Sequence, residues 1–211
     1  SRGLGDVYKR QAYTYNTRNE VFSNAQTGNV VLMSQNFMTG KWEAGLKYLF
    51  PLFAFALGVL IAEQIQHKYK YAKRLHWRQG ILGAEIIILF IVGFIPQRGN
   101  MIATVLVSFA CAMQVQSFRK VNGFSYASTM CIGNLRSGTA ALSFYLRERR
   151  PEQLRQAMYY LGIIVLFAIG AGIGGNLSAN YGIHMIWVSC GLLIVSFLLM
   201  FLDIEARRSR A

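Results

Sequence analysis

The longest uncharged stretch of the chain runs from Gln156 to Leu202 and contains no Asp, Glu, Lys or Arg. It is interrupted once, between Gly174 and Gly182, where Gly and Asn residues are concentrated. Each half is close to the ~20 apolar residues that cross a ~30 Å hydrocarbon layer as a helix. A surface helix of a soluble protein needs polar side chains on its outer face. The pattern therefore predicts two consecutive membrane-spanning helices, over 158–177 and 183–202.

Three earlier apolar segments predict three more spans, over 45–65, 80–96 and 101–118. Their only charged residues are Lys47 and Glu63, near the two ends of the first segment, and Glu85 in the second. A helix satisfies its own backbone hydrogen bonds inside lipid. We therefore expect an all-α, polytopic transmembrane helical bundle with five complete spans, forming a single transmembrane domain over 12–211.

Lys and Arg are concentrated in every second connection between these spans. The 67–79 loop, the 119–155 segment and the 207–210 tail are rich in them, whereas the 98–100 turn has one and the 178–182 turn has none. Cytoplasmic loops carry an excess of Lys and Arg. We therefore expect the C-terminus on the cytoplasmic side, with the basic loops against anionic lipid head groups.

The net charge of +13 would also suit a nucleic-acid-binding protein. The basic residues, however, lie in short clusters between apolar runs, where they set orientation in a membrane. We therefore expect the lipid bilayer as the main partner and no nucleic acid. The three cysteines, Cys111, Cys131 and Cys190, show no CxxC or Cys/His spacing, so we expect no metal site and no cofactor.

The N-terminal residues differ in character from the rest of the chain. The polar stretch 1–11 is similar to an adaptor-like leader at the end of a metagenomic reading frame, and we expect it to lie outside the natural sequence. The loop charges place the segment before Gly45 outside the cell. An intact protein with a cytoplasmic N-terminus then needs one more helix before it, which makes about six helices in total.

Two segments far apart in the chain are similar to each other. Phe22 to Val31 reads FSNAQTGNVV and Ala127 to Arg136 reads ASTMCIGNLR, and the apolar core 55–58 corresponds to 167–170. We interpret 12–96 and 101–202 as two repeats of three helices each. Because three is odd, the second repeat would be inverted relative to the first, an arrangement common in transporters.

Short motifs spread over the chain carry a family resemblance. They are Ala12 to Tyr15, Phe22 to Asn29, Met113-Gln114, Phe118 to Lys120, and Thr129 to Arg136. With these motifs the chain resembles the YoaK-like bacterial membrane proteins of the DUF1275 family, as an N-terminally truncated member. Two positions depart from the family pattern: Gln11 replaces a usual Asp, and Ile132 replaces a frequent Thr. The resemblance implies about six helices in a bacterial inner membrane and supplies no activity.

The two repeated segments contain the first set of candidate site residues. These residues are Thr27, Gly28, Asn29, Thr129, Gly133 and Asn134. A Gly permits close backbone approach, and an Asn side chain can cap free N–H groups or bind a ligand. Two interpretations stay open at this point: a helix start with tight packing, or a site that contacts or gates a substrate.

Charged residues in or near the spans form the second set, as candidates for ion coupling. A carboxylate inside a span, such as Glu85, is costly unless it is protonated, hydrated or paired. Glu63 lies closer to the cytoplasmic end of its span, with Arg119 and Arg136 as candidate partners. The alternative is that these groups are interfacial and either hydrated or salt-bridged.

No catalytic motif is present: the chain has no HExxH, no Gly-x-Ser-x-Gly and no phosphate-binding Gly-rich loop. We therefore expect no enzyme. The leading hypothesis is a permease or transporter for a small-molecule substrate; the alternative is a non-transporting scaffold or accessory subunit. A homo-oligomer is compatible with either. We call Phe22 to Val31 the first Gly-Asn segment and Ala127 to Arg136 the second. A transporter should have Glu85 and both segments around one shared cavity, whereas a scaffold should have a filled core.

Overall fold

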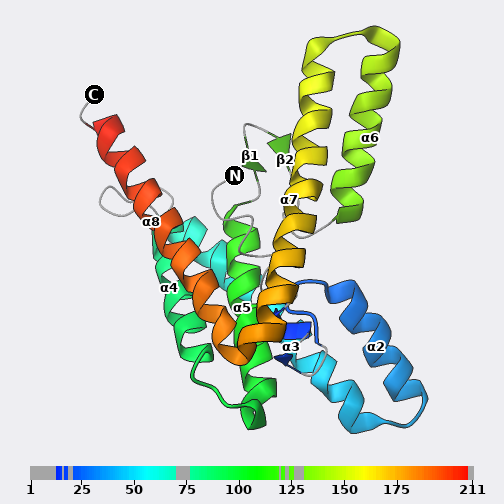
Figure 1. The fold of residues 1–211 in the computed structure, drawn as a ribbon, viewed down its shortest axis with the longest axis vertical. Coiled ribbons are helices and arrows are strands. Elements are labelled where there is room, and N and C mark those ends of the chain that lie inside the picture. The colour runs from blue at the N-terminus through cyan, green and yellow to red at the C-terminus, as the bar shows by residue number, and fades with distance from the viewer. Residues whose placement is uncertain are drawn as a thin grey trace.

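The computed structural model describes residues 13–15, 17–18, 21–69, 77–118, 120–121, 124–125 and 131–208, and the expected leader 1–11 lies outside them. The described chain is almost entirely helical (Figure 1). Its α-helices are α2 (Gln26–Met38), α3 (Trp42–Tyr69), α4 (Trp77–Val92), α5 (Asn100–Ser117), α6 (Cys131–Glu148), α7 (Pro151–Tyr181) and α8 (Ile186–Arg208). Short 3-10 turns, η1 (Gln97–Gly99) and η2 (Gly182–Met185), precede α5 and α8, and a two-residue pairing joins β1 (Lys120–Val121) to β2 (Phe124–Ser125). The expected all-α membrane bundle is confirmed.

Each predicted span corresponds to one long apolar helix. By length and hydropathy, three stretches can cross a membrane: α3, the η1–α5 stretch Gln97–Ser117, and Pro151–Met200, which contains α7 and most of α8. Helix α4 is equally apolar but has 16 residues, about 24 Å at 1.5 Å per residue. It ends at Val92, earlier than the predicted 96, because the chain turns at Gly93, whose N–H bonds to the Leu89 and Phe90 carbonyls.

The predicted break between Gly174 and Gly182 is displaced. Helix α7 continues through this region to Tyr181, and the Asn180 amide donates to the Asn176 carbonyl at 3.0 Å and to its side-chain oxygen at 3.1 Å. The chain turns only at Gly182, where φ is +56°, a conformation that glycine adopts without strain. The Gly and Asn residues before it therefore belong to the helix.

Helix α5 is the most buried of the candidate spans, and it lies between α3 and α4. The core cluster of α4, α5 and α8 includes Leu89, Val107 and Leu193, all fully buried. Helix α3 approaches α5 closely at Gly58, where an added Cβ would lie 2.5 Å from the Phe109 carbonyl oxygen. Small residues allow this type of close packing between membrane helices.

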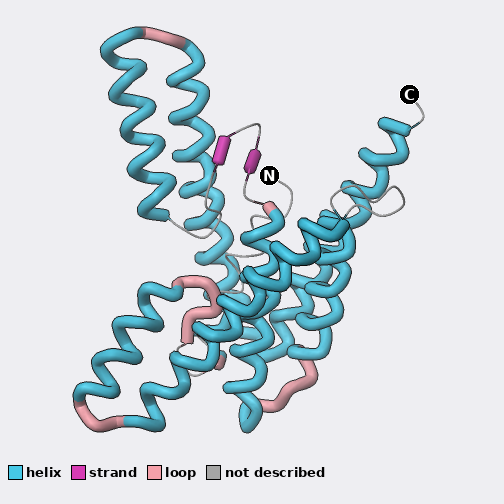
Figure 2. Tube along the Cα trace, turned by 180° about the vertical axis from the view of Figure 1, so that it is seen from behind, coloured by secondary structure: helices cyan, strands magenta, loops and turns pink. Residues whose placement is uncertain are grey.

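Two helical hairpins extend from this bundle in opposite directions, as Figures 1 and 2 both show. In one, α2 packs against the first half of α3, with the Phe37 ring over Gly45. In the other, α6 packs against α7, with Gly138 against Tyr160 and Leu161. Each hairpin consists of a short helix that begins at a Gly-Asn segment and the long helix that follows it.

Candidate functional site

The first Gly-Asn segment lies beside the middle of α5. The Ser108 hydroxyl of α5 donates to the Ser23 carbonyl at 3.0 Å, and the Ser23 N–H donates to the Thr14 hydroxyl at 3.2 Å. Ser108 is near the centre of Asn100–Ser117, and we use "mid-depth" for this level of the bundle. Residues 21–25 are not helical. Irregular backbone at membrane depth is tolerated where protein buries it or where it lines a cavity.

Asn29 uses its amide to close this loop on itself. Its side-chain oxygen accepts the Phe22 N–H at 3.1 Å, and its NH2 group donates to the Phe22 carbonyl at 2.6 Å and to the Gln26 side chain at 3.0 Å. Asn29 is fully buried, and an added Cβ on Gly28 would lie 3.1 Å from the Phe22 ring. Thr27 is exposed. For Gly28 and Asn29 these contacts favour the interpretation as helix start and tight packing.

Helix α2 begins near mid-depth and runs outward. Gln26 is eleven residues before Phe37, which packs on Gly45; that separation is about 16 Å along a helix. In an antiparallel hairpin, the start of α2 is then level with about residue 56, in the middle of the predicted span 45–65. Helix α2 therefore crosses only half of the apolar layer.

Helix α6 repeats this arrangement in the opposite direction. Cys131 is seven residues before Gly138, which packs on Tyr160, so the start of α6 is about 10 Å farther along, level with about residue 167. Asn134 is buried, and Gly133 and Arg136 are exposed. Thr129 and Arg119 lie outside the described residues. In Figure 1 the N-terminal ends of α2 and α6 both point toward the middle of the molecule.

Glu85 is also at mid-depth and is fully buried. Helices α4 and α5 are antiparallel: the Arg78 guanidinium donates to the Ser117 carbonyl at one end, and Val92 lies near Asn100 at the other. Glu85 is halfway between residues 78 and 92, and it is therefore level with Ser108. It lies on the α4 face that carries the buried core residues Leu82 and Leu89. Glu85 and the first Gly-Asn segment thus share a depth beside α5.

Glu63 has a partner that the sequence did not indicate. It is half-buried and accepts a hydrogen bond from the Gln116 side chain of α5. Of the two partners predicted for it, Arg136 is exposed on α6 and Arg119 is outside the described residues.

Arg18 is a buried cation that sequence patterns missed. It is fully buried, and it donates to the Tyr13 hydroxyl, to the carbonyls of Val92 and Ile95, and to the Asn100 side chain, at distances from 2.9 to 3.2 Å. A longer contact of 3.4 Å reaches the Pro96 carbonyl. All these partners are neutral. The Val92 carbonyl belongs to the last residue of α4, where the helix dipole favours a cation, and the Ile95 carbonyl lies three residues beyond it. The signal was weak because Arg18 is outside every apolar run.

Ser23 and Asn24 were also missed, although they lie within the first Gly-Asn segment. The Ser23 hydroxyl and both amide atoms of Asn24 are buried and have no hydrogen-bond partner in the part of the chain that the structure describes. Asn24 as a whole is 6% exposed. Buried polar groups of this type are rare, because each unmade hydrogen bond costs about 1–3 kcal/mol. They mark a place where an outside group would be stabilised.

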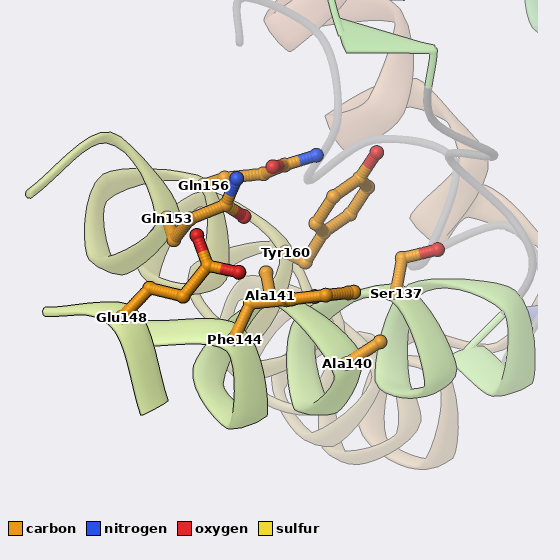
Figure 3. A pocket seen from close by; sticks show the side chains of 8 residues that line it. All are labelled: Ser137, Ala140, Ala141, Phe144, Glu148, Gln153, Gln156 and Tyr160. Carbon is orange, nitrogen blue, oxygen red and sulfur yellow. The ribbon is translucent and has the colours of Figure 1, made fainter. Parts of the chain in front are cut away.

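A separate pocket of about 470 Å³ lies between α6 and α7. Figure 3 shows the side chains of Glu148, Gln153, Gln156 and Tyr160 around it. The Glu148 carboxylate is held by the Arg150 guanidinium at 3.0 Å. Neither Glu85 nor any residue of the first Gly-Asn segment lines this pocket, so it is not the shared cavity that the transport hypothesis requires.

Among the described residues, no group of three or more His, Cys, Asp or Glu side chains could hold a metal ion.

A family model described as "Protein of unknown function (DUF1275)" matches residues 11–199. The chain is 25% identical over 186 residues to the UPF0700 transmembrane protein YoaK of Bacillus subtilis (strain 168). The aligned region covers 82% of this chain and 80% of that protein. No solved structure matches the chain.

Proposed function

The chain belongs to the DUF1275 family, and from this premise we propose that it is a transporter or permease for a small solute. One observation carries the proposal: the helical path is interrupted at mid-depth at Val21–Ala25, where the half-length helix α2 begins. Discontinuous helices near the bilayer midplane form the substrate and ion sites of many transporters. The proposal assigns no chemical reaction to the protein.

The opposite directions of the two hairpins support an inverted repeat, with repeat one in 12–96 and repeat two in 101–202 (Figures 1 and 2). In such a protein the two halves can exchange conformations and expose a central site to alternate sides of the membrane. The buried carboxyl group of Glu85, level with the first Gly-Asn segment, is the candidate for coupling transport to protons, because intramembrane Asp and Glu residues form the proton relays of many pumps and transporters.

The second candidate is a non-transporting scaffold or accessory subunit. The observation in its favour is that Asn29 satisfies its amide within the chain, as a structural cap would. In either case we propose a bacterial inner membrane location, a cytoplasmic C-terminus, and contacts of the basic loops with anionic lipid head groups.

The test is proton-coupled uptake of a metabolite panel into vesicles that contain the wild-type protein or Glu85→Gln. We expect uptake driven by a pH gradient in the wild type and a loss of at least tenfold in Glu85→Gln, because the amide cannot exchange a proton. Glu43→Gln is the matched control, since Glu43 is exposed at the start of α3. Gradient-driven uptake that is unchanged in Glu85→Gln would remove Glu85 from the mechanism. A folded wild type that takes up nothing and co-purifies with a partner would favour the scaffold.

A further inference from the structure

The N-terminus of α2 is a helix end without a side-chain cap, and the buried loop that leads into it lies against the bundle. Its N-cap residue is Ala25, and no side chain among the described residues caps it. The first N–H groups of any helix have no partner within the helix, and together with the helix dipole they give that end a partial positive charge. The loop just before it is at mid-depth, where the Ser108 hydroxyl donates to the Ser23 carbonyl.

The residues just before this helix end supply a second and independent observation. The hydroxyl of Ser23 and the amide of Asn24 precede Ala25, and both are buried without a hydrogen-bond partner in the described chain. Asn24 can donate two hydrogen bonds and accept two. Its NH2 group, the Ser23 hydroxyl and the free N–H groups of α2 are all donors, and a group rich in acceptors would satisfy them together.

The surrounding charges favour an anion in this position. Arg18 is fully buried with neutral partners, and it contacts α5 at Asn100, about 12 Å along that helix from Ser108. Charges separated by such distances still interact inside a protein, because its effective dielectric constant is far below that of water. Of the described acidic side chains, Glu85 on α4 is the one at this depth.

We propose that Ser23, Asn24 and the N-terminus of α2 form a binding site for a small anion, a carboxylate or an inorganic oxyanion. The transported solute would carry this anionic group, and that part of the inference rests on the proposed transport function. Helix N-termini bind such groups through backbone N–H donors, and half-length helices of transporters present them to anionic substrates. Asn29 has a positioning role, because its bonds to Phe22 hold the loop in place.

The first test measures thermal unfolding of the detergent-purified protein during titration with sodium acetate, nitrate or phosphate. Ionic strength is held constant with a bulky sulfonate. We expect a saturable increase in Tm with at least one of the three anions, because a ligand that binds only the native state stabilises it. In Asn24→Leu, which has a similar volume and no amide, the apparent affinity should decrease at least tenfold.

Asn36→Leu is the matched control. Asn36 is in the same helix near its C-terminal end, and its amide bonds to the Leu32 carbonyl. This control should respond to the anions like the wild type. Equal responses in Asn24→Leu and Asn36→Leu, or no response in the wild type, would overturn the anion site.

Asn24→Asp provides a test that does not depend on the tolerance for leucine. Its own carboxylate would occupy the site, and the variant should unfold at or above the wild-type Tm measured without anion, with no further response to acetate. A Tm decrease as large as that of Asn24→Leu would show that the helix end does not favour negative charge and would contradict the proposal.

Uptake of radiolabelled acetate and phosphate into vesicles separates this inference from the proposed transport. Saturable binding without uptake of any solute would retain the anion site and overturn transport. Uptake of neutral or cationic solutes by a protein that binds none of the three anions would retain transport and overturn the anion site. Anion uptake that is lost in Asn24→Leu and kept in Asn36→Leu would support both.

Discussion

Three buried polar residues of this protein differ in how their side chains are hydrogen-bonded. Asn29, Asn24 and Arg18 are all at least nine-tenths buried, yet they behave differently. The Asn29 amide is fully used by the loop, the Arg18 guanidinium joins three segments of chain, and the Asn24 amide has no partner among the described residues. Residue type alone would not distinguish the two asparagines, which are five positions apart in one motif.

Arg18 yields a prediction about stability. Arg18→Met should lower the free energy of unfolding by about 3 kcal/mol, because the carbonyls of Val92 and Ile95 and the Asn100 side chain lose the hydrogen bonds that Arg18 donates. Arg18→Lys should lose less, since it keeps the charge at the helix end. The measurement is denaturant or thermal unfolding in detergent, with Arg155→Met as the control because Arg155 is exposed. A stable Arg18→Met variant would mean that these hydrogen bonds contribute little.

At the scale of helices, glycines decide where segments approach or turn. Gly58 permits the close contact of α3 with α5, and Gly182 ends α7. Gly58 and Gly170, which occupy corresponding places in the two proposed repeats, are both buried. Apolar periodicity located all five long helices but not their ends, because ends depend on backbone conformation and on local hydrogen bonds such as that of Asn180.

Gly58→Ala tests the helix contact. The added Cβ would lie 2.5 Å from the Phe109 carbonyl oxygen and 2.8 Å from the Ala112 Cβ. Backbone cannot move aside as a side chain can, and overpacking of this kind costs about 1–3 kcal/mol. Gly83→Ala on α4 is the matched control: its Cβ would meet nothing within 4 Å, and alanine favours the helix by up to about 1 kcal/mol. Unfolding midpoints that rank Gly58→Ala at or above Gly83→Ala would contradict the close contact.

At the scale of the whole molecule, two short helices begin near the middle and extend away from the bundle in opposite directions, each beside a long helix (Figure 1). The charge pattern along the chain predicted which loops share a side of the membrane, and the inverted repeat stays part of the proposed function. One cavity shared by Glu85 and both Gly-Asn segments stays a prediction. The pocket between α6 and α7 is elsewhere.

The orientation can be tested with reporter fusions. Green fluorescent protein fused after Ala211 should fluoresce, and alkaline phosphatase at the same point should be inactive, because the basic tail is expected to stay in the cytoplasm. Alkaline phosphatase inserted at Arg98 should be active. That turn joins α4 to α5 at the end opposite the basic segments 67–79 and 119–155, which are expected in the cytoplasm. Active phosphatase at the C-terminus would invert the predicted topology.

The length of the uncharged apolar runs by itself determined that this chain is a membrane protein of long helices. A segment that spans lipid satisfies its backbone hydrogen bonds by forming a helix, because the hydrocarbon layer contains no water. The family motifs in the sequence also singled out the two Gly-Asn segments as candidate sites. Only the tertiary structure decided how the first of these segments is arranged. The loop 21–25 passes Ser108, Asn29 closes it on Phe22, and the Asn24 amide has no partner among the described residues. Those outcomes depend on contacts between residues as far apart as Ser23 and Ser108, which no local pattern encodes.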